Sequence, residues 1–147
     1  MFDNVLKMLF GNNGSRRGNN NYRNRGGAKF IYKLVPFEQA RMMIENNQVT
    51  LMDVRTPNEY DLVHIKNSIN MPVDEIEKRI FTYNQTDPIM VYCSSGTRSK
   101  TAIQILNGLG YNNIYIWEYG ALATFPYKNM LVYSENVKKG YWYDKKS

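Results

Sequence analysis

The feature that most constrains this chain is a set of short apolar runs that alternate with stretches of helical periodicity. Residues 49–54, 89–92 and 113–117 form three such runs, each bounded by polar residues, and residues 32–35 and 68–71 are two further strand candidates. Short continuous apolar runs are typical of strands that are buried on both faces. Their alternation with helices predicts an α/β fold: an open, mainly parallel sheet with helices on both faces.

Three helices are expected between these strands. The first starts at Pro36, the second is capped by Asp74, and the third spans residues 98–109 and ends at Gly110. Their expected buried faces contain Phe37, Ala40, Met43 and Ile44 in the first helix, Ile76, Ile80 and Phe81 in the second, and Ala102, Ile105, Leu106 and Leu109 in the third.

The positive charge of the chain lies at one end of it. The formal net charge is +6, and residues 1–33 hold seven cations against the single anion Asp3, which is the whole surplus. The remaining residues therefore sum to zero. Because the excess lies outside the apolar runs, we do not expect the folded part to bind nucleic acid.

Composition divides the 147 residues into three parts. Residues 11–28 consist of Asn, Gly and Arg with three exceptions, which predicts a disordered linker. Residues 1–10 are apolar but too short to span a bilayer, so we expect a frayed terminus, with a weak peripheral membrane contact as the alternative. The predicted organisation is therefore an N-terminal segment and linker at 1–28, one domain at 29–127, and a C-terminal extension at 128–147.

The chain has one cysteine, Cys93, and one histidine, His64. A single cysteine excludes an intrachain disulfide and favours a reducing, cytoplasmic environment. One thiol and one imidazole do not provide the ligands of a typical zinc site, so we expect neither a metal nor another cofactor.

Cys93 follows the apolar run 89–92 and precedes a predicted helix, which is where parallel sheets bind ligands. The residues after it are small, so their backbone N–H groups can turn inward and, with the helix N-terminus, favour an anion or a thiolate. Gly96 permits a positive φ angle and Arg98 adds a fixed cation. Such a thiolate attacks sulfur or phosphorus; a buried structural thiol is the non-catalytic alternative. Four residues separate Cys93 from Arg98, one fewer than in the Cys-x5-Arg loop of tyrosine phosphatases, which leaves less room for a phosphoryl group.

Three ordered motifs carry a resemblance to a known family. Residues 51–60 (LMDVRTPNEY) with 64–72 (HIKNSINMP), the loop 93–99 (CSSGTRS), and a closing portion that includes GLGY at 108–111 and Gly120 occur in this order. Together they resemble the rhodanese family over roughly residues 30–127. The resemblance implies a single-domain sulfurtransferase of the thiosulfate sulfurtransferase class.

The resemblance also implies a mechanism. The Cys93 thiolate attacks the outer sulfur of thiosulfate or a similar donor, releases sulfite, and becomes a persulfide, from which cyanide or a small-molecule or protein thiol then takes the sulfur. The expected substrate-binding residues are Ser94, Ser95, Gly96, Thr97, Arg98 and Ser99. Within this loop, backbone N–H groups hold the persulfide, the hydroxyls of Ser95 and Ser99 donate hydrogen bonds, and Arg98 orients the sulfonate.

Some positions depart from the family pattern or allow a second interpretation. Ser94 stands where the family often has arginine, so the site has one cation fewer. Asp53 and Arg55 are supporting candidates near the loop, although an internal ion pair with Glu59 is the simpler interpretation. His64 is expected to be structural. Two rival functions remain open: a cysteine-dependent phosphatase or arsenate reductase, and a non-catalytic interaction module on the same fold.

Overall fold

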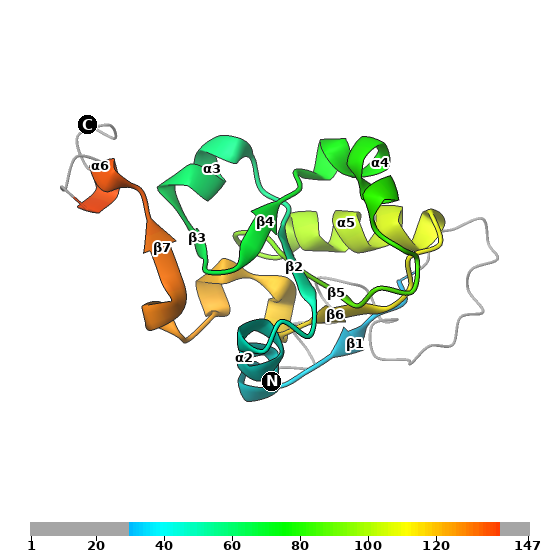
Figure 1. Ribbon diagram of the computed structural model, residues 1–147, viewed down its shortest axis with the longest axis horizontal. Helices are drawn as coiled ribbons and strands as arrows, with labels where there is room; N and C mark the ends of the chain where they lie inside the picture. The colour runs from blue at the N-terminus through cyan, green and yellow to red at the C-terminus, as the bar shows by residue number, and fades with distance from the viewer. Residues whose placement is uncertain (1–29, 139–147) are drawn as a thin grey trace.

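A parallel sheet forms the centre of the structure, a computed structural model that describes residues 30–138 (Figure 1). Its strands are β1 (Lys33–Leu34), β2 (Thr50–Asp53), β4 (Ser68–Asn70), β5 (Ile89–Tyr92) and β6 (Ile114–Ile116). They lie in the order β1-β6-β5-β2-β4, and every neighbouring pair is parallel. The predicted mainly parallel sheet is therefore confirmed. The predicted N-terminal segment and linker lie outside the described residues.

Helices cover both faces of this sheet. Helices α4 (Ile76–Arg79) and α5 (Thr97–Gly108) pack on one face, and α2 (Phe37–Glu45) packs on the other with the 3-10 turn η6 (Leu122–Thr124) (Figure 1). Successive strand residues point to opposite faces. Met52 and Val91 thus join the α5 core, whereas Leu51 and Met90 join the α2 core. A sheet buried on both sides explains the continuous apolar runs.

Local sequence determines where the helices start and end. Helix α2 begins after Pro36, and α3 (Pro57–Leu62) begins with a capping box in which Thr56 and Glu59 bond reciprocally. Helix α5 begins after Gly96, whose φ is 112°. The remaining short elements are the 3-10 turns η3 (Val73–Glu75), η4 (Ile80–Thr82), η5 (Glu118–Gly120) and η7 (Lys128–Met130), and helix α6 (Glu135–Lys138).

The second predicted helix differs from expectation. Asp74 lies inside η3 and does not cap α4; the N-cap residue of α4 is Glu75, which makes no side-chain capping hydrogen bond. Ile76 and Ile80 are buried as predicted, but Phe81 is 71% exposed. The predicted helix is interrupted, because α4 is four residues long and the chain continues as the tighter turn η4. The 3.6-residue period therefore does not extend to Phe81.

The buried face of α5 is also rotated from the predicted one. Ala102 and Leu106 are buried as expected, together with Ile103 and Asn107. Ile105 is only partly buried. The amide of Asn107 explains its burial, because its side-chain nitrogen donates to the Tyr111 carbonyl (3.0 Å) and its oxygen accepts a backbone bond.

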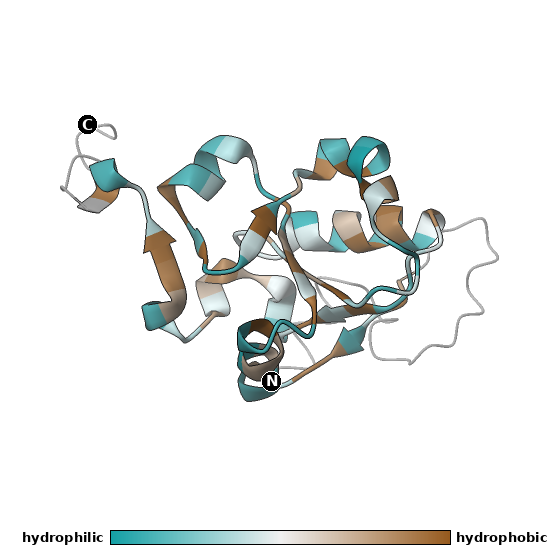
Figure 2. Ribbon diagram, viewed as in Figure 1, coloured by the Kyte–Doolittle hydropathy of each residue, from teal (hydrophilic) through white to brown (hydrophobic). Residues whose placement is uncertain are grey.

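A second, two-stranded sheet was absent from the sequence prediction. Strand β3 (Val63–Ile65) pairs antiparallel with β7 (Leu131–Tyr133), which belongs to the predicted C-terminal extension (Figure 1). The N–H of Lys66 donates to the Met130 carbonyl at 2.8 Å, and Met130 is buried. The mainly hydrophobic β7 (Figure 2) thus places the start of the extension against the domain.

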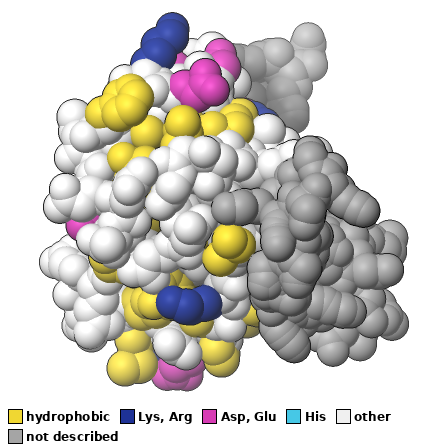
Figure 3. All heavy atoms as spheres, turned by 90° about the vertical axis from the view of Figure 1, so that its right-hand side faces the viewer, with side chains coloured by type: hydrophobic (Ala, Val, Ile, Leu, Met, Phe, Trp, Pro, Cys, Tyr) yellow, Lys and Arg dark blue, Asp and Glu magenta, His cyan; other side chains and the backbone are white. Residues whose placement is uncertain are grey.

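Charge on the described surface is dispersed. On the face shown in Figure 3, few charged side chains are visible, and the basic ones among the described residues form no continuous patch. None of the helices within residues 30–138 combines the length and the hydrophobicity needed to cross a lipid bilayer.

Candidate active site

Cys93 lies at the carboxyl end of β5, where the chain turns into α5. Its N–H donates to the Gly120 carbonyl (3.1 Å), and its carbonyl accepts from the Leu122 N–H (2.7 Å). The residue also forms an isolated parallel bridge with Ala121. The segment after β6 therefore fixes the backbone of Cys93, and the residue itself is 1% exposed.

Two backbone N–H groups point at the Cys93 sulfur. Gly96 N lies 3.0 Å and Ser99 N lies 3.3 Å from Sγ. Gly96 reaches this geometry with a φ of 112°, which favours glycine. Gly96 is the N-cap residue of α5 and Ser99 lies in the first turn of this helix. The N–H dipoles of both residues and the N-terminal end of the helix therefore favour negative charge on the sulfur.

Ser99 acts on the loop through its hydroxyl as well as its N–H. The buried hydroxyl donates to the Gly120 carbonyl at 2.7 Å. That carbonyl also accepts the Cys93 N–H, so one peptide group joins the strand end to the helix start. The hydroxyl of Ser99 is thus directed at the backbone and not at the sulfur, which corrects the expectation that it donates to the substrate.

Gly120 is a supporting residue whose contacts were not predicted from the sequence, where it appeared only within the closing motif. Its φ is 59°, and a Cβ atom at this position lies 3.3 Å from Cβ and 3.4 Å from Oγ of Ser99. The preceding residue, Tyr119, also has a positive φ of 66°. Gly120 follows β6 after three residues and directly precedes Ala121, which bridges Cys93; a glycine in the segment after a strand is the sequence signal for such a close approach.

Arg98 forms a two-point ion pair with Glu59. Its Nη1 lies 2.6 Å from Oε1 and its Nη2 lies 3.0 Å from Oε2, while Nη2 is 3.4 Å from the hydroxyl of Ser94. The Arg98 guanidinium lowers the pKa of Glu59 to about 2. The expected internal ion pair therefore forms between Asp53 and Arg55 alone, and Glu59 is not part of it. The Thr56-x-x-Glu59 spacing of a capping box was the available signal that Glu59 is held elsewhere.

Asp53 and Arg55 form their own buried pair at the end of β2. Asp53 is 0% and Arg55 is 4% exposed, and Nη2 of Arg55 lies 2.7 Å from Oδ2 of Asp53. Arg55 also donates to the Val63 carbonyl. The side-chain amide of Asn70 donates to the backbone carbonyls of Asp53 and of Arg55. The pair thus joins β2 to β4 and to the start of β3, next to the strand that carries Cys93.

The other loop side chains form the mouth of the site. Ser95 and Thr97 are exposed, and Ser94 is half-buried. Thr97 is the first residue of α5, and the N-cap position belongs to Gly96. By the mouth of the site we mean the surface that these hydroxyls and the Arg98–Glu59 pair form.

His64 lies in β3, on the second sheet. Its Nδ1 donates to the Tyr60 carbonyl at 2.7 Å, and its ring stacks on the Tyr60 ring at 3.8 Å. These contacts join α3 to β3 and give the imidazole a structural role.

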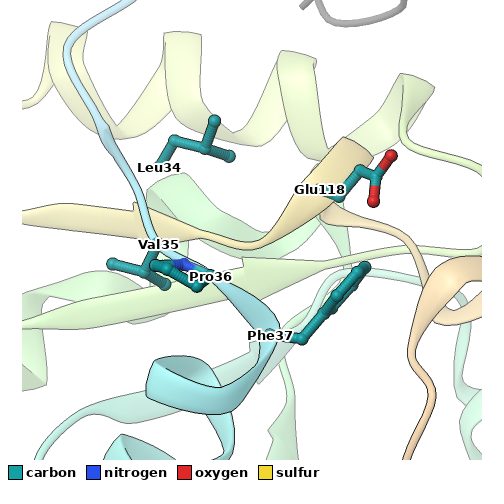
Figure 4. Close-up of a pocket in the computed structure, with 5 residues that line it drawn as sticks. All are labelled: Leu34, Val35, Pro36, Phe37 and Glu118. Atoms are coloured by element: carbon teal, nitrogen blue, oxygen red, sulfur yellow. The ribbon is translucent and has the colours of Figure 1, made fainter. Parts of the chain in front are cut away.

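A pocket of about 240 Å³ lies at the β1 edge of the sheet. Leu34, Val35 and Pro36 line it, and Phe37 and Glu118 flank it from α2 and from the segment after β6 (Figure 4). Glu118 follows β6 as Cys93 follows β5, so the pocket and the cysteine lie at the same carboxyl edge.

The fold and the site define a class of protein: an α/β domain with a cysteine at the carboxyl end of a central parallel strand and backbone N–H groups around its sulfur. Comparison with known proteins shows which family of this class the chain belongs to. Residues 37–123 match the rhodanese-like domain family, and the chain belongs to this family.

Individual relatives agree with this assignment. Thiosulfate sulfurtransferase GlpE of Pseudomonas syringae is 32% identical over 84 residues, covering 57% of this chain and 78% of the relative. Thiosulfate sulfurtransferase PspE of Escherichia coli is 37% identical over 65 residues, covering 43% of this chain but only 62% of the relative. A crystal structure of a rhodanese-related protein from Thermoplasma volcanium is similar with a TM-score of 0.58 and 28% identity, over 69% of this chain and 98% of that one.

Proposed function

We propose that this protein is a sulfurtransferase that carries sulfur as a persulfide on Cys93. The observation that carries the proposal is the pair of N–H groups, from Gly96 and Ser99, aimed at Sγ. Family membership and the names of the relatives support sulfur as the transferred atom. The same N–H groups that favour a thiolate also favour the anionic persulfide that replaces it.

The reaction has two displacement steps. In the first, the Cys93 thiolate forms a bond to the outer sulfur of thiosulfate, the S–S bond of the donor breaks, and sulfite leaves with the bonding electron pair. In the second, an acceptor thiolate or cyanide attacks the terminal sulfur of the persulfide, and Cys93 leaves as the thiolate. Each step conserves charge, so no external oxidant or reductant is required.

The burial of Cys93 shapes both steps. The thiol is 1% exposed, and the neighbouring loop residues Ser95 and Thr97 are exposed while Ser94 is half-buried, so we expect a donor to approach from the side of these residues. The acceptor then meets the terminal sulfur, which projects one bond further toward solvent than Sγ.

Intact-protein mass spectrometry after incubation with thiosulfate tests the proposal. The wild type is expected to gain the mass of one sulfur atom and to lose it on addition of cyanide. Cys93→Ser and iodoacetamide-treated wild type are the controls, and both are expected to show no gain. Absence of the adduct with thiosulfate and with alkyl persulfides contradicts the proposal, and Cys93-dependent hydrolysis of an aryl phosphate in its place favours a phosphatase.

A further inference from the structure

We propose that Glu59 determines the donor preference of this site by neutralising Arg98, so that the mouth accepts persulfides of thiols in preference to thiosulfate. The inference rests on the proposed function and specifies its donor class. It starts from the finding that the loop cation, expected to orient a sulfonate, is already bound at two points by a carboxylate.

The first support is the position of Arg98 relative to the reacting sulfur. Nη2 of Arg98 lies 3.4 Å from the hydroxyl of Ser94, the residue that follows Cys93. A free cation here attracts an anionic donor. With Glu59 at 2.6 Å the two charges sum to zero, so the attraction for a dianion is lost.

The second support is the rigidity of the carboxylate. Glu59 lies in the first turn of α3, where Oε1 accepts hydrogen bonds from the N–H of Thr56 (2.9 Å) and from its hydroxyl (3.1 Å). These bonds hold the carboxylate against Arg98 from a different element than the catalytic loop. The next cation along α5, Lys100, has its ammonium over the ring of Phe30, 5.6 Å from the centroid.

The two donor classes differ in the charge next to the transferred sulfur. In thiosulfate the outer sulfur is bonded directly to a sulfonate, and both negative charges enter the mouth with it. In a thiol persulfide the outer sulfur is bonded to an uncharged sulfur on a carbon chain. The Cys93 thiolate bonds to that outer sulfur, the S–S bond breaks, the thiolate of the donor leaves, and the proton on the outer sulfur stays with the new persulfide.

Glu59→Gln tests the inference because glutamine keeps the size of glutamate and one acceptor oxygen for Thr56, but it removes the negative charge and replaces the second acceptor for Arg98 with an NH2 donor. Initial rates are measured with thiosulfate and with glutathione persulfide as donors, using one common acceptor. We expect kcat/KM for thiosulfate to rise about tenfold, mainly through KM, and kcat/KM for the persulfide to change less than about threefold. The ratio of the two values cancels any general change in Cys93 reactivity caused by movement of the loop.

Two further variants separate charge from structure. Glu75→Gln breaks an exposed pair with Arg79 on α4 (2.9 Å) and is expected to leave both donors unchanged. The double variant Glu59→Gln/Arg98→Gln is expected to lose the gain for thiosulfate, because the released cation is gone.

The outcomes distinguish this inference from the proposed function. If neither donor loads Cys93, the proposed function fails. If both donors load it but the ratio is unchanged in Glu59→Gln, or if the wild type already prefers thiosulfate, the inference about Glu59 is overturned and the persulfide chemistry stands. A gain for thiosulfate that persists in the double variant also overturns it.

Discussion

The buried pair of Asp53 and Arg55 gives the sharpest test of how the structure is held together near the site. Replacing Arg55 with methionine keeps the length of the aliphatic chain but removes the guanidinium. The Asp53 carboxylate then loses donors at 2.9 and 2.7 Å and retains the backbone N–H of residue 55 at 3.0 Å. The Val63 carbonyl loses its donor as well.

The expected cost follows from the burial of the carboxylate. Asp53 is 0% exposed, and removing one partner of a buried ion pair costs about 3–5 kcal/mol because the other charge stays uncompensated. With a urea m-value of about 2 kcal/mol/M, the unfolding midpoint falls by about 2 M. This is a large part of the about 5–15 kcal/mol that stabilises a typical domain.

Urea unfolding followed by circular dichroism measures the loss. The double variant Asp53→Asn/Arg55→Met removes both charges, so we expect it to be more stable than Arg55→Met alone. Arg41→Met is the matched control, because Arg41 pairs with Glu38 and Glu45 on the exposed side of α2 and its loss is expected to change the unfolding midpoint little. A cost for Arg55→Met no larger than that of the control refutes the reasoning, and so does a double variant equal to the sum of the two single ones.

Three further predictions concern single positions. Gly120→Ala is expected to lower the unfolding free energy by about 1–3 kcal/mol and to slow sulfur loading, because Gly120 has a positive φ and lies close to the buried Ser99. Gly108 has nothing within 4 Å of an added Cβ, so Gly108→Ala is expected to be neutral or stabilising in the same urea assay. The pKa of Glu59 is lowered from 4.5 to about 2, so its contribution to stability is present above about pH 4.5 and is lost as the pH falls toward 2. The difference in unfolding free energy between wild type and Glu59→Gln, which solvent screening keeps below about 1 kcal/mol, should therefore shrink between about pH 6 and about pH 2.5. A difference that stays constant over this range contradicts the prediction. Ile80→Ala should cost about 2–5 kcal/mol and Phe81→Ala less than about 0.5 kcal/mol, and the reverse order in urea unfolding contradicts the burial pattern.

The parts of the fold that were predicted depend on local pattern. The run 89–92 coincides with β5, because a strand buried on both faces has a continuous apolar sequence bounded by polar residues. The position of Cys93 directly after that strand followed from the same pattern. These features are encoded within a few consecutive residues, and no distant partner is needed to recognise them.

The parts that were missed depend on partners far apart in the chain. Val63 and Tyr133 are paired strand residues 70 positions apart, and each strand has only three residues. Glu59 and Arg98 are separated by 39 positions, and Ser99 and Gly120 by 21. A carboxylate in the sequence is compatible with several cations, and only the position of α3 beside the loop 93–99 selects Arg98.

These long-range contacts also locate the source of the positive potential at the sulfur. Residues 34–147 have no net charge, and Arg98, the cation of the loop 93–99, is paired with Glu59. The remaining attraction for a negative sulfur comes from the N–H groups of Gly96 and Ser99, whose dipoles act over a few ångströms and are little affected by salt. Their direction depends on the Gly120 carbonyl, which binds the N–H of Cys93 and the hydroxyl of Ser99. A small displacement of this peptide should therefore reduce sulfur loading more than a change in ionic strength does, since the former turns the donors away from Sγ and the latter screens only distant charges.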